Sequence, residues 1–157
     1  MTTARQWAIA VARTLSADAV PESGVPLAEF QAHAASRLTQ IVREWGGALL
    51  ADGVGLGKTR VALTAAAAVA RDQRMAGARG PVWFCVPART VVSWRRALAE
   101  SDLDDTVVVS HAALSRGQTP AQSPIMVVVD EAHRFRNPDT KRRHTLSEVA
   151  DVPILLV

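Results

Sequence analysis

Five short apolar runs, separated by segments of helical or loop character, constrain the fold of this 157-residue chain most strongly. The runs are residues 48–51, 82–86, 106–109, 125–129 and 154–157. They are almost entirely apolar instead of alternating apolar with polar residues, which is typical of strands buried on both faces. Such strands, alternating with helices, predict an α/β domain in which a mostly parallel sheet lies between two helical layers.

Two helices are predicted before the first of these runs. Residues 3–16 carry apolar side chains at helical spacing, and two prolines and a glycine interrupt the pattern after them. A second helix is predicted from Leu27 to the glycine pair that begins at Gly46. Its apolar stripe consists of Phe30, Ala34, Leu38, Ile41, Val42 and Trp45. We expect an N-terminal helix and linker over residues 1–26 and one domain over residues 27–157.

The charge is mildly basic, with a net charge of +3 and a pI of about 10.0. Many of the basic residues cluster late in the chain, in Arg134-Phe-Arg136 and Lys141-Arg-Arg143. A basic cluster is compatible with a nucleic-acid partner, and it is equally compatible with a solvated helix face.

The single cysteine, Cys85, lies in an apolar run, which predicts a buried structural thiol and excludes an intramolecular disulfide. No segment approaches the roughly 18 apolar residues that span a membrane, and no secretory leader is recognisable. We therefore expect a cytoplasmic protein without a membrane partner. The alanine- and arginine-rich composition suggests a bacterial source.

The glycine-rich segment between the first apolar run and an alanine-rich helix carries the strongest chemical signal. In a strand–loop–helix of this kind, backbone N–H groups and the positive end of the helix dipole bind phosphate. Lys58 is placed to reach the β- and γ-phosphate oxygens, and the Thr59 hydroxyl to hold Mg²⁺. The expected nucleotide-binding residues are Asp52, Gly53, Val54, Gly55, Leu56, Gly57, Lys58 and Thr59.

This P-loop departs from the strict pattern because Asp52 stands where the first glycine is usual. The alternative interpretation is a glycine-rich turn between a strand and a helix, which would not require lysine and threonine after the last glycine.

A second candidate site follows the run 125–129, which ends in Asp130-Glu-Ala-His133. Carboxylates at the carboxyl end of a strand, on the same sheet as a P-loop, are expected in an ATPase site. Asp130 would hold Mg²⁺, and Glu131 would act as the general base on the attacking water. The alternative is a helix N-cap with a surface charge.

The segments Asp52-Gly-Val-Gly-Leu-Gly-Lys-Thr59 and Asp130-Glu-Ala-His-Arg-Phe-Arg-Asn137 resemble motifs I and II of superfamily-two helicases. The resemblance is closest to the Swi/Snf-like branch with a DEAH-type motif II, which also has Asp at the position of Asp52. It implies a RecA-like fold, ATP and Mg²⁺ as cofactors, and nucleic acid, most often double-stranded DNA, as partner. It also implies that His133 couples the ATP site to the nucleic acid.

Three further segments resemble family motifs in the same order along the chain. Leu27-Ala-Glu-Phe-Gln31 resembles the Q-motif, which implies that Gln31 pairs with adenine. Cys85-Val-Pro-Ala-Arg-Thr-Val-Val-Ser-Trp94 resembles motif Ia, and Val109-Ser-His-Ala-Ala-Leu114 resembles motif Ib, although His111 replaces the usual aromatic residue. Both motifs touch the nucleic-acid backbone in the family. The residues to which this role is carried over are Arg89, Thr90, Ser110 and His111.

Each of these assignments has a structural alternative. Gln31 can be an ordinary polar helix residue, Arg89 a surface charge and Trp94 a core aromatic residue. His111 can be a solvated loop histidine. Contacts in a folded chain distinguish these alternatives.

The family also has a second RecA-like domain, which supplies an arginine finger worth roughly 10³ to 10⁵ in rate. Because the chain ends at the strand that precedes motif III, we expect an incomplete first domain, which binds nucleotide far better than it hydrolyses it. Two other functions are weighed against an ATPase lobe: an inactive remnant or interaction module without turnover, and a small P-loop kinase.

Overall fold

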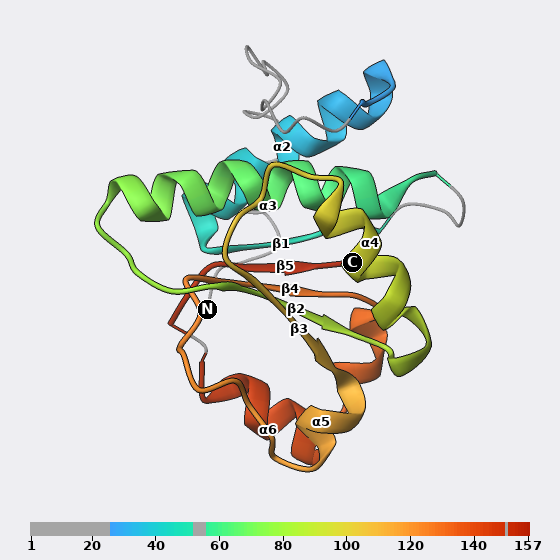
Figure 1. Cartoon of the computed structure of the whole chain (residues 1–157), viewed down its shortest axis with the longest axis vertical. Helices are drawn as coiled ribbons and strands as arrows, with labels where there is room; N and C mark the ends of the chain where they lie inside the picture. The colour runs from blue at the N-terminus through green and yellow to red at the C-terminus, as the bar shows by residue number, and fades with distance from the viewer. Residues whose placement is uncertain (1–25, 52–55, 150) are drawn as a thin grey trace, which may run out of the picture.

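A computed structural model describes residues 26–51, 56–149 and 151–157 (Figure 1). The strands are β1 Gly47–Leu49, β2 Val82–Val86, β3 Thr106–Ser110, β4 Met126–Val129 and β5 Ile154–Leu156. The helices are α2 Glu29–Trp45, α3 Lys58–Met75, α4 Val91–Ala99, α5 His111–Ser115 and α6 Lys141–Ser147, with 3₁₀ turns η1 Ala88–Thr90 and η2 Ala132–Phe135. The helix predicted over residues 3–16 lies outside the described residues.

The five strands form one sheet in the order β1-β5-β4-β2-β3, and every neighbouring pair is parallel. This confirms the α/β class and sharpens the prediction of a mostly parallel sheet. All five predicted apolar runs become strands. The first strand begins one residue earlier than predicted, at Gly47.

Helices cover both faces of the sheet, so the predicted three layers are present (Figure 1). On one face, α2, α3 and α4 pack against alternate strand residues that include Phe84 and Val128. On the other face, α5, α6 and η2 pack against the intervening residues, among them Trp83 and Val127. Side chains point alternately to the two faces of a strand, so consecutive residues enter different cores.

Alanine determines how closely α3 approaches the sheet. The alanines of α3 with no exposed surface are Ala62, Ala65, Ala66 and Ala70. A small side chain at each of these positions allows the helix backbone to lie close to its neighbours, and interiors packed in this way tolerate little change in volume. The alanine-rich segment therefore fixes the position of the helix that follows the P-loop.

The predicted stripe of α2 is wrong at its two ends. Phe30 is 54% exposed and Trp45 is 36% exposed, whereas Leu38, Ile41 and Val42 are buried as expected. Gln31 takes the inward position in the first turn, because its side chain bonds to the loop before α3. This rotation directs Phe30 toward solvent.

Two late elements were not predicted, namely η2 and α6. Lys141 and Arg143 are exposed on α6, which fits the solvated-helix interpretation of that basic cluster. Cys85 is fully buried and free, as predicted, and burial raises the pKa of its thiol to about 12. Within the described ranges, no helix is both long enough and apolar enough to cross a bilayer.

Candidate functional site

The strand register brings the predicted motifs to one edge of the sheet. Leu49, Leu156 and Val129 lie side by side on β1, β5 and β4. Val129 is level with Cys85 of β2, which pairs with Val109 of β3. Because the strands are parallel, the chain leaves all of them at this edge. The P-loop and the acidic pair follow strands that are separated only by β5, so they start roughly 10 Å apart, twice the interstrand spacing.

The P-loop is described from Leu56 onward, and Asp52, Gly53, Val54 and Gly55 lie outside the described residues. Gly57 is the N-cap of α3 and has φ 78° and ψ 32°, a left-handed conformation that favours glycine. Lys58 and Thr59 form the start of the helix, and its first turn contains no acidic residue. The N-terminus of α3 therefore presents the positive end of the helix dipole, which suits a phosphate.

Gln31 is buried against this loop. Its Oε1 accepts a hydrogen bond from the Ala28 N–H at 3.0 Å, and its Nε2 donates to the Leu56 carbonyl oxygen at 3.0 Å. A Cβ atom at Gly57 would collide with Gln31 Nε2. Gln31 thus connects the start of α2 to the P-loop and is more than an ordinary polar helix residue. Its contact with adenine stays a prediction.

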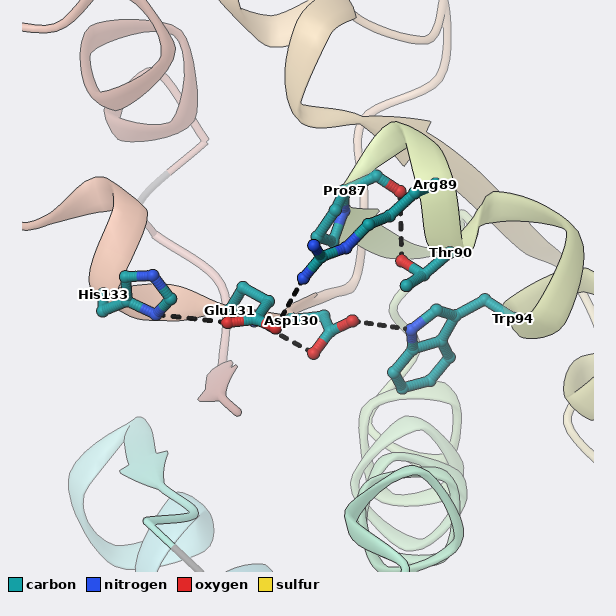
Figure 2. A network of polar contacts seen from close by, with 7 residues as sticks. All are labelled: Pro87, Arg89, Thr90, Trp94, Asp130, Glu131 and His133. Carbon is teal, nitrogen blue, oxygen red and sulfur yellow. Dashed lines mark hydrogen bonds and ion pairs between the residues drawn. The ribbon is translucent and has the colours of Figure 1, made fainter. Parts of the chain in front are cut away.

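Asp130 is held by three hydrogen bonds, and Figure 2 shows the two that its carboxylate accepts. Its backbone N–H donates to the Cys85 carbonyl at 2.9 Å. Its Oδ2 accepts from the Trp94 indole Nε1–H at 2.9 Å, and its Oδ1 accepts from the Glu131 N–H at 3.0 Å. Trp94 is only 3% exposed, which confirms the core-aromatic interpretation. It also has a polar contact that this interpretation did not include.

Glu131 lies between two basic side chains. Its Oε1 is 3.4 Å from Arg89 Nη2, and its Oε2 is 3.3 Å from His133 Nδ1 (Figure 2). The backbone of Glu131 is left-handed, with φ 53° and ψ 47°. This conformation costs a non-glycine residue about 1–2 kcal/mol, and such strain concentrates at functional sites.

The residues predicted to contact nucleic acid lie at or just after the ends of β2 and β3, at the same edge. Arg89 is exposed and points toward Glu131, while Thr90 Oγ1 donates to the Pro87 carbonyl at 3.0 Å (Figure 2). Ser110 caps α5, because its Oγ accepts from the Ala113 N–H at 3.1 Å. These side chains therefore have local structural partners.

His111 is placed differently from the other three residues. It is 4% exposed, its Nε2 lies 3.2 Å from the Cys85 carbonyl oxygen, and its ring packs edge-on against Phe135. It is therefore a buried residue and not a solvated loop histidine. Burial lowers the pKa of His111, against the opposing effect of the bond to Cys85. The ring supports the carbonyl that also binds the Asp130 N–H and is not presented at the surface.

Sequence reasoning missed two contacts that shape the site, Trp94 with Asp130 and Arg89 with Glu131. A buried indole N–H usually finds an acceptor, and this rule was the available signal for the first contact. Nothing in the sequence indicated the second, because surface ion pairs depend on how two loops are placed.

The candidate magnesium ligands, Thr59 and Asp130, offer the oxygen atoms that Mg²⁺ prefers. No cluster of three or more His, Cys, Asp or Glu residues that could hold a metal occurs in the part of the chain that is described. Mg²⁺ commonly uses one or two protein oxygens together with substrate phosphates and water. The residues present therefore fit a magnesium ion shared with a nucleotide.

Comparison with known proteins identifies the fold. No protein-family model and no curated protein matches the sequence. Among solved structures, the chain is similar to the Sulfolobus solfataricus SWI2/SNF2 ATPase core in complex with dsDNA, with a TM-score of 0.70 and 20% sequence identity. The match covers 90% of this chain and 33% of that one. The chain therefore has a RecA-like fold, and it spans about a third of the length of that solved chain.

Proposed function

We propose that the chain forms the ATP-binding lobe of a DNA-dependent ATPase or translocase of the helicase type, completed by a second RecA-like domain. The observation that carries this proposal is the meeting at one sheet edge of the glycine-capped start of α3 and the pair Asp130–Glu131. The likeness to an ATPase core solved with dsDNA supports it at the level of fold.

In this proposal each residue at the edge has one role. Lys58 binds the β- and γ-phosphate oxygens, and Thr59 and Asp130 hold Mg²⁺. The ion, when bound, neutralises charge on the phosphates. Glu131 accepts a proton from the attacking water as general base. Its two carboxylate oxygens lie beside Arg89 and His133, so the base is in contact with residues proposed to sense nucleic acid.

Nucleotide titration tests the proposal directly. Lys58→Ala should weaken ATP binding about 10- to 100-fold, since a hydrogen bond to a charged group contributes about 1.5–3 kcal/mol. Lys141, the chain's other lysine, is exposed at the start of α6, which covers the opposite face of the sheet from α3, so Lys141→Ala is a matched control. Circular dichroism checks that both variants fold. Equal affinity in the two folded variants would refute the P-loop assignment.

Fluorescence anisotropy with labelled duplexes tests the partner. Binding should weaken as salt rises, and Arg89→Ala should lower the slope of log K against log salt by about one, the contribution of one phosphate contact. We expect double-stranded DNA to bind more tightly than double-stranded RNA of the same sequence. The reverse preference would move the proposal toward an RNA-dependent ATPase.

A further inference from the structure

Two buried tryptophans of the domain differ in what their indole N–H groups meet. Trp83 on β2 is 1% exposed, and its Nε1 has no hydrogen-bond partner among the described residues. Trp94 on α4 is 3% exposed, and its Nε1 donates to Asp130 Oδ2 at 2.9 Å. The two residues lie in the cores on opposite faces of the sheet.

The hydrogen bond from Trp94 is one of two that fix the orientation of the Asp130 carboxylate. The other oxygen, Oδ1, accepts from the Glu131 N–H at 3.0 Å, so each carboxylate oxygen has one donor (Figure 2). Rotation about the side-chain bond would break at least one of these contacts. Each oxygen keeps a lone pair for another partner, since a carboxylate offers about four acceptor sites.

The donor is as rigidly held as the acceptor. The Trp94 ring packs against Phe84 of β2 with the ring centroids 5.4 Å apart, inside the core between α4 and the sheet. An indole N–H can only donate, so it cannot replace the carboxylate as a ligand of a cation. Its contribution at this site is therefore to orient Asp130.

We propose that Trp94 is a positioning residue that fixes the Asp130 carboxylate for Mg²⁺. This inference rests on the proposed nucleotide-binding function. Residues that hold a metal ligand in place are often worth 10- to 100-fold in metal affinity. The indole N–H, rather than the aromatic ring, carries the effect, so tryptophan and phenylalanine should differ at this position.

Trp94→Phe tests the inference because it keeps a packed ring and removes the N–H, and Trp83→Phe is the matched control. The affinity for a fluorescent ATP analogue is measured in excess Mg²⁺ and in EDTA, and the ratio of the two values reports the contribution of the metal. Trp94→Phe should lower this ratio about 10-fold with little change in the EDTA value. Trp83→Phe should keep the parent ratio. A purely structural defect would weaken binding under both conditions.

The outcomes separate the two proposals. A parent protein that does not bind the analogue would overturn the proposed function and this inference together. A parent that binds with a strong Mg²⁺ effect, and a Trp94→Phe variant with the same ratio, would overturn only the role of Trp94.

A second measurement uses the native tryptophan, in case Trp94→Phe does not fold. Indole N–H resonances in a ¹H–¹⁵N spectrum are assigned with Trp7→Phe, Trp45→Phe and Trp83→Phe, which leaves Trp94 by elimination. Addition of Mg²⁺ to the nucleotide-bound protein should shift the Trp94 resonance more than that of Trp83. A Trp94 resonance that does not move would also overturn the inference.

Discussion

On the face of the sheet that carries α2, α3 and α4, completely buried alanines of α3 bring a long helix close to the strands. The opposite face is packed by larger side chains on shorter elements, among them Leu114 of α5, Phe135 of η2 and Leu146 of α6. The first arrangement fixes one rigid helix, and the second joins several short segments around a few large residues.

The second face is also less completely covered. Leu49 of β1 is 60% exposed there, and it lines an open groove of about 660 Å³ with Ile154 and Leu156 of β5. On the first face the same two strands contribute Ala48 and Leu155, which are buried.

The difference in packing between the two faces shows how the two parts of the candidate site, the start of α3 and Asp130, are supported. The end of α3 that we propose binds phosphate depends on the closely packed face, where a change in volume of one methylene is felt. Asp130 depends on both faces, because Trp94 holds its side chain from one core and His111 supports the Cys85 carbonyl from the other. Four predictions test this comparison, from the largest effect to the smallest.

Leu63→Ala, in the second turn of α3, should give the largest loss of stability. The side chain is 2% exposed, and a cavity at such a position costs about 2–5 kcal/mol. The measurement is the free energy of unfolding from urea denaturation followed by circular dichroism. A cost below about 1 kcal/mol would show that the first face can collapse around a cavity and is not rigidly packed.

Ala66→Leu should cost about 1–3 kcal/mol, because added methylenes force α3 away from the sheet. The same displacement should weaken nucleotide binding, since the N-terminus of α3 moves with the helix. Ala112→Leu on the exposed side of α5 is the control and should change neither quantity. Weakened nucleotide binding in the control as well would contradict the assignment of the phosphate site to α3.

A change of pH should have a smaller effect on stability, and this effect acts through His111 on the second face. Burial lowers the pKa of His111 below its usual value of 6.5, so the unfolded chain binds a proton more readily than the folded protein. Stability should therefore fall as the pH drops below about 6.5.

His111→Gln removes the titrating group and keeps a side-chain donor for the Cys85 carbonyl, so this variant should lose less stability between pH 7 and pH 5. The control is His33→Gln on the exposed side of α2, which should follow the parent protein. Urea midpoints at several pH values provide the measurement. Parallel curves for His111→Gln and the parent would mean that the ring titrates as it does in the unfolded chain.

Leu49→Ala should have the smallest effect, within about 0.5 kcal/mol, as is usual for exposed positions. It is the same substitution as Leu63→Ala, made on the opposite face. The difference between the two free energies of unfolding therefore compares the packing of the two faces directly. A cost above about 2 kcal/mol for Leu49→Ala would mean that this side chain is packed in solution and that the two faces are covered alike.

The strands and the general position of the site were predictable from local sequence. The apolar run that precedes Asp130 indicated a buried strand, and the segment before Lys58 indicated a loop that leads into a helix. Both depend on patterns within a few residues. The inward rotation of Gln31 was not predictable in this way, because it depends on the carbonyl of Leu56, which is 25 residues away in sequence.

The sequence by itself determined the class of fold, the buried thiol of Cys85 and the order in which the glycine-rich and acidic segments follow their strands. Only the tertiary structure decided the strand order β1-β5-β4-β2-β3, the contact of Trp94 with Asp130 and the burial of His111. The physical reason is one of range. Strand and helix character depend on side chains a few positions apart, whereas hydrogen bonds and burial depend on segments that meet only after the whole sheet has formed.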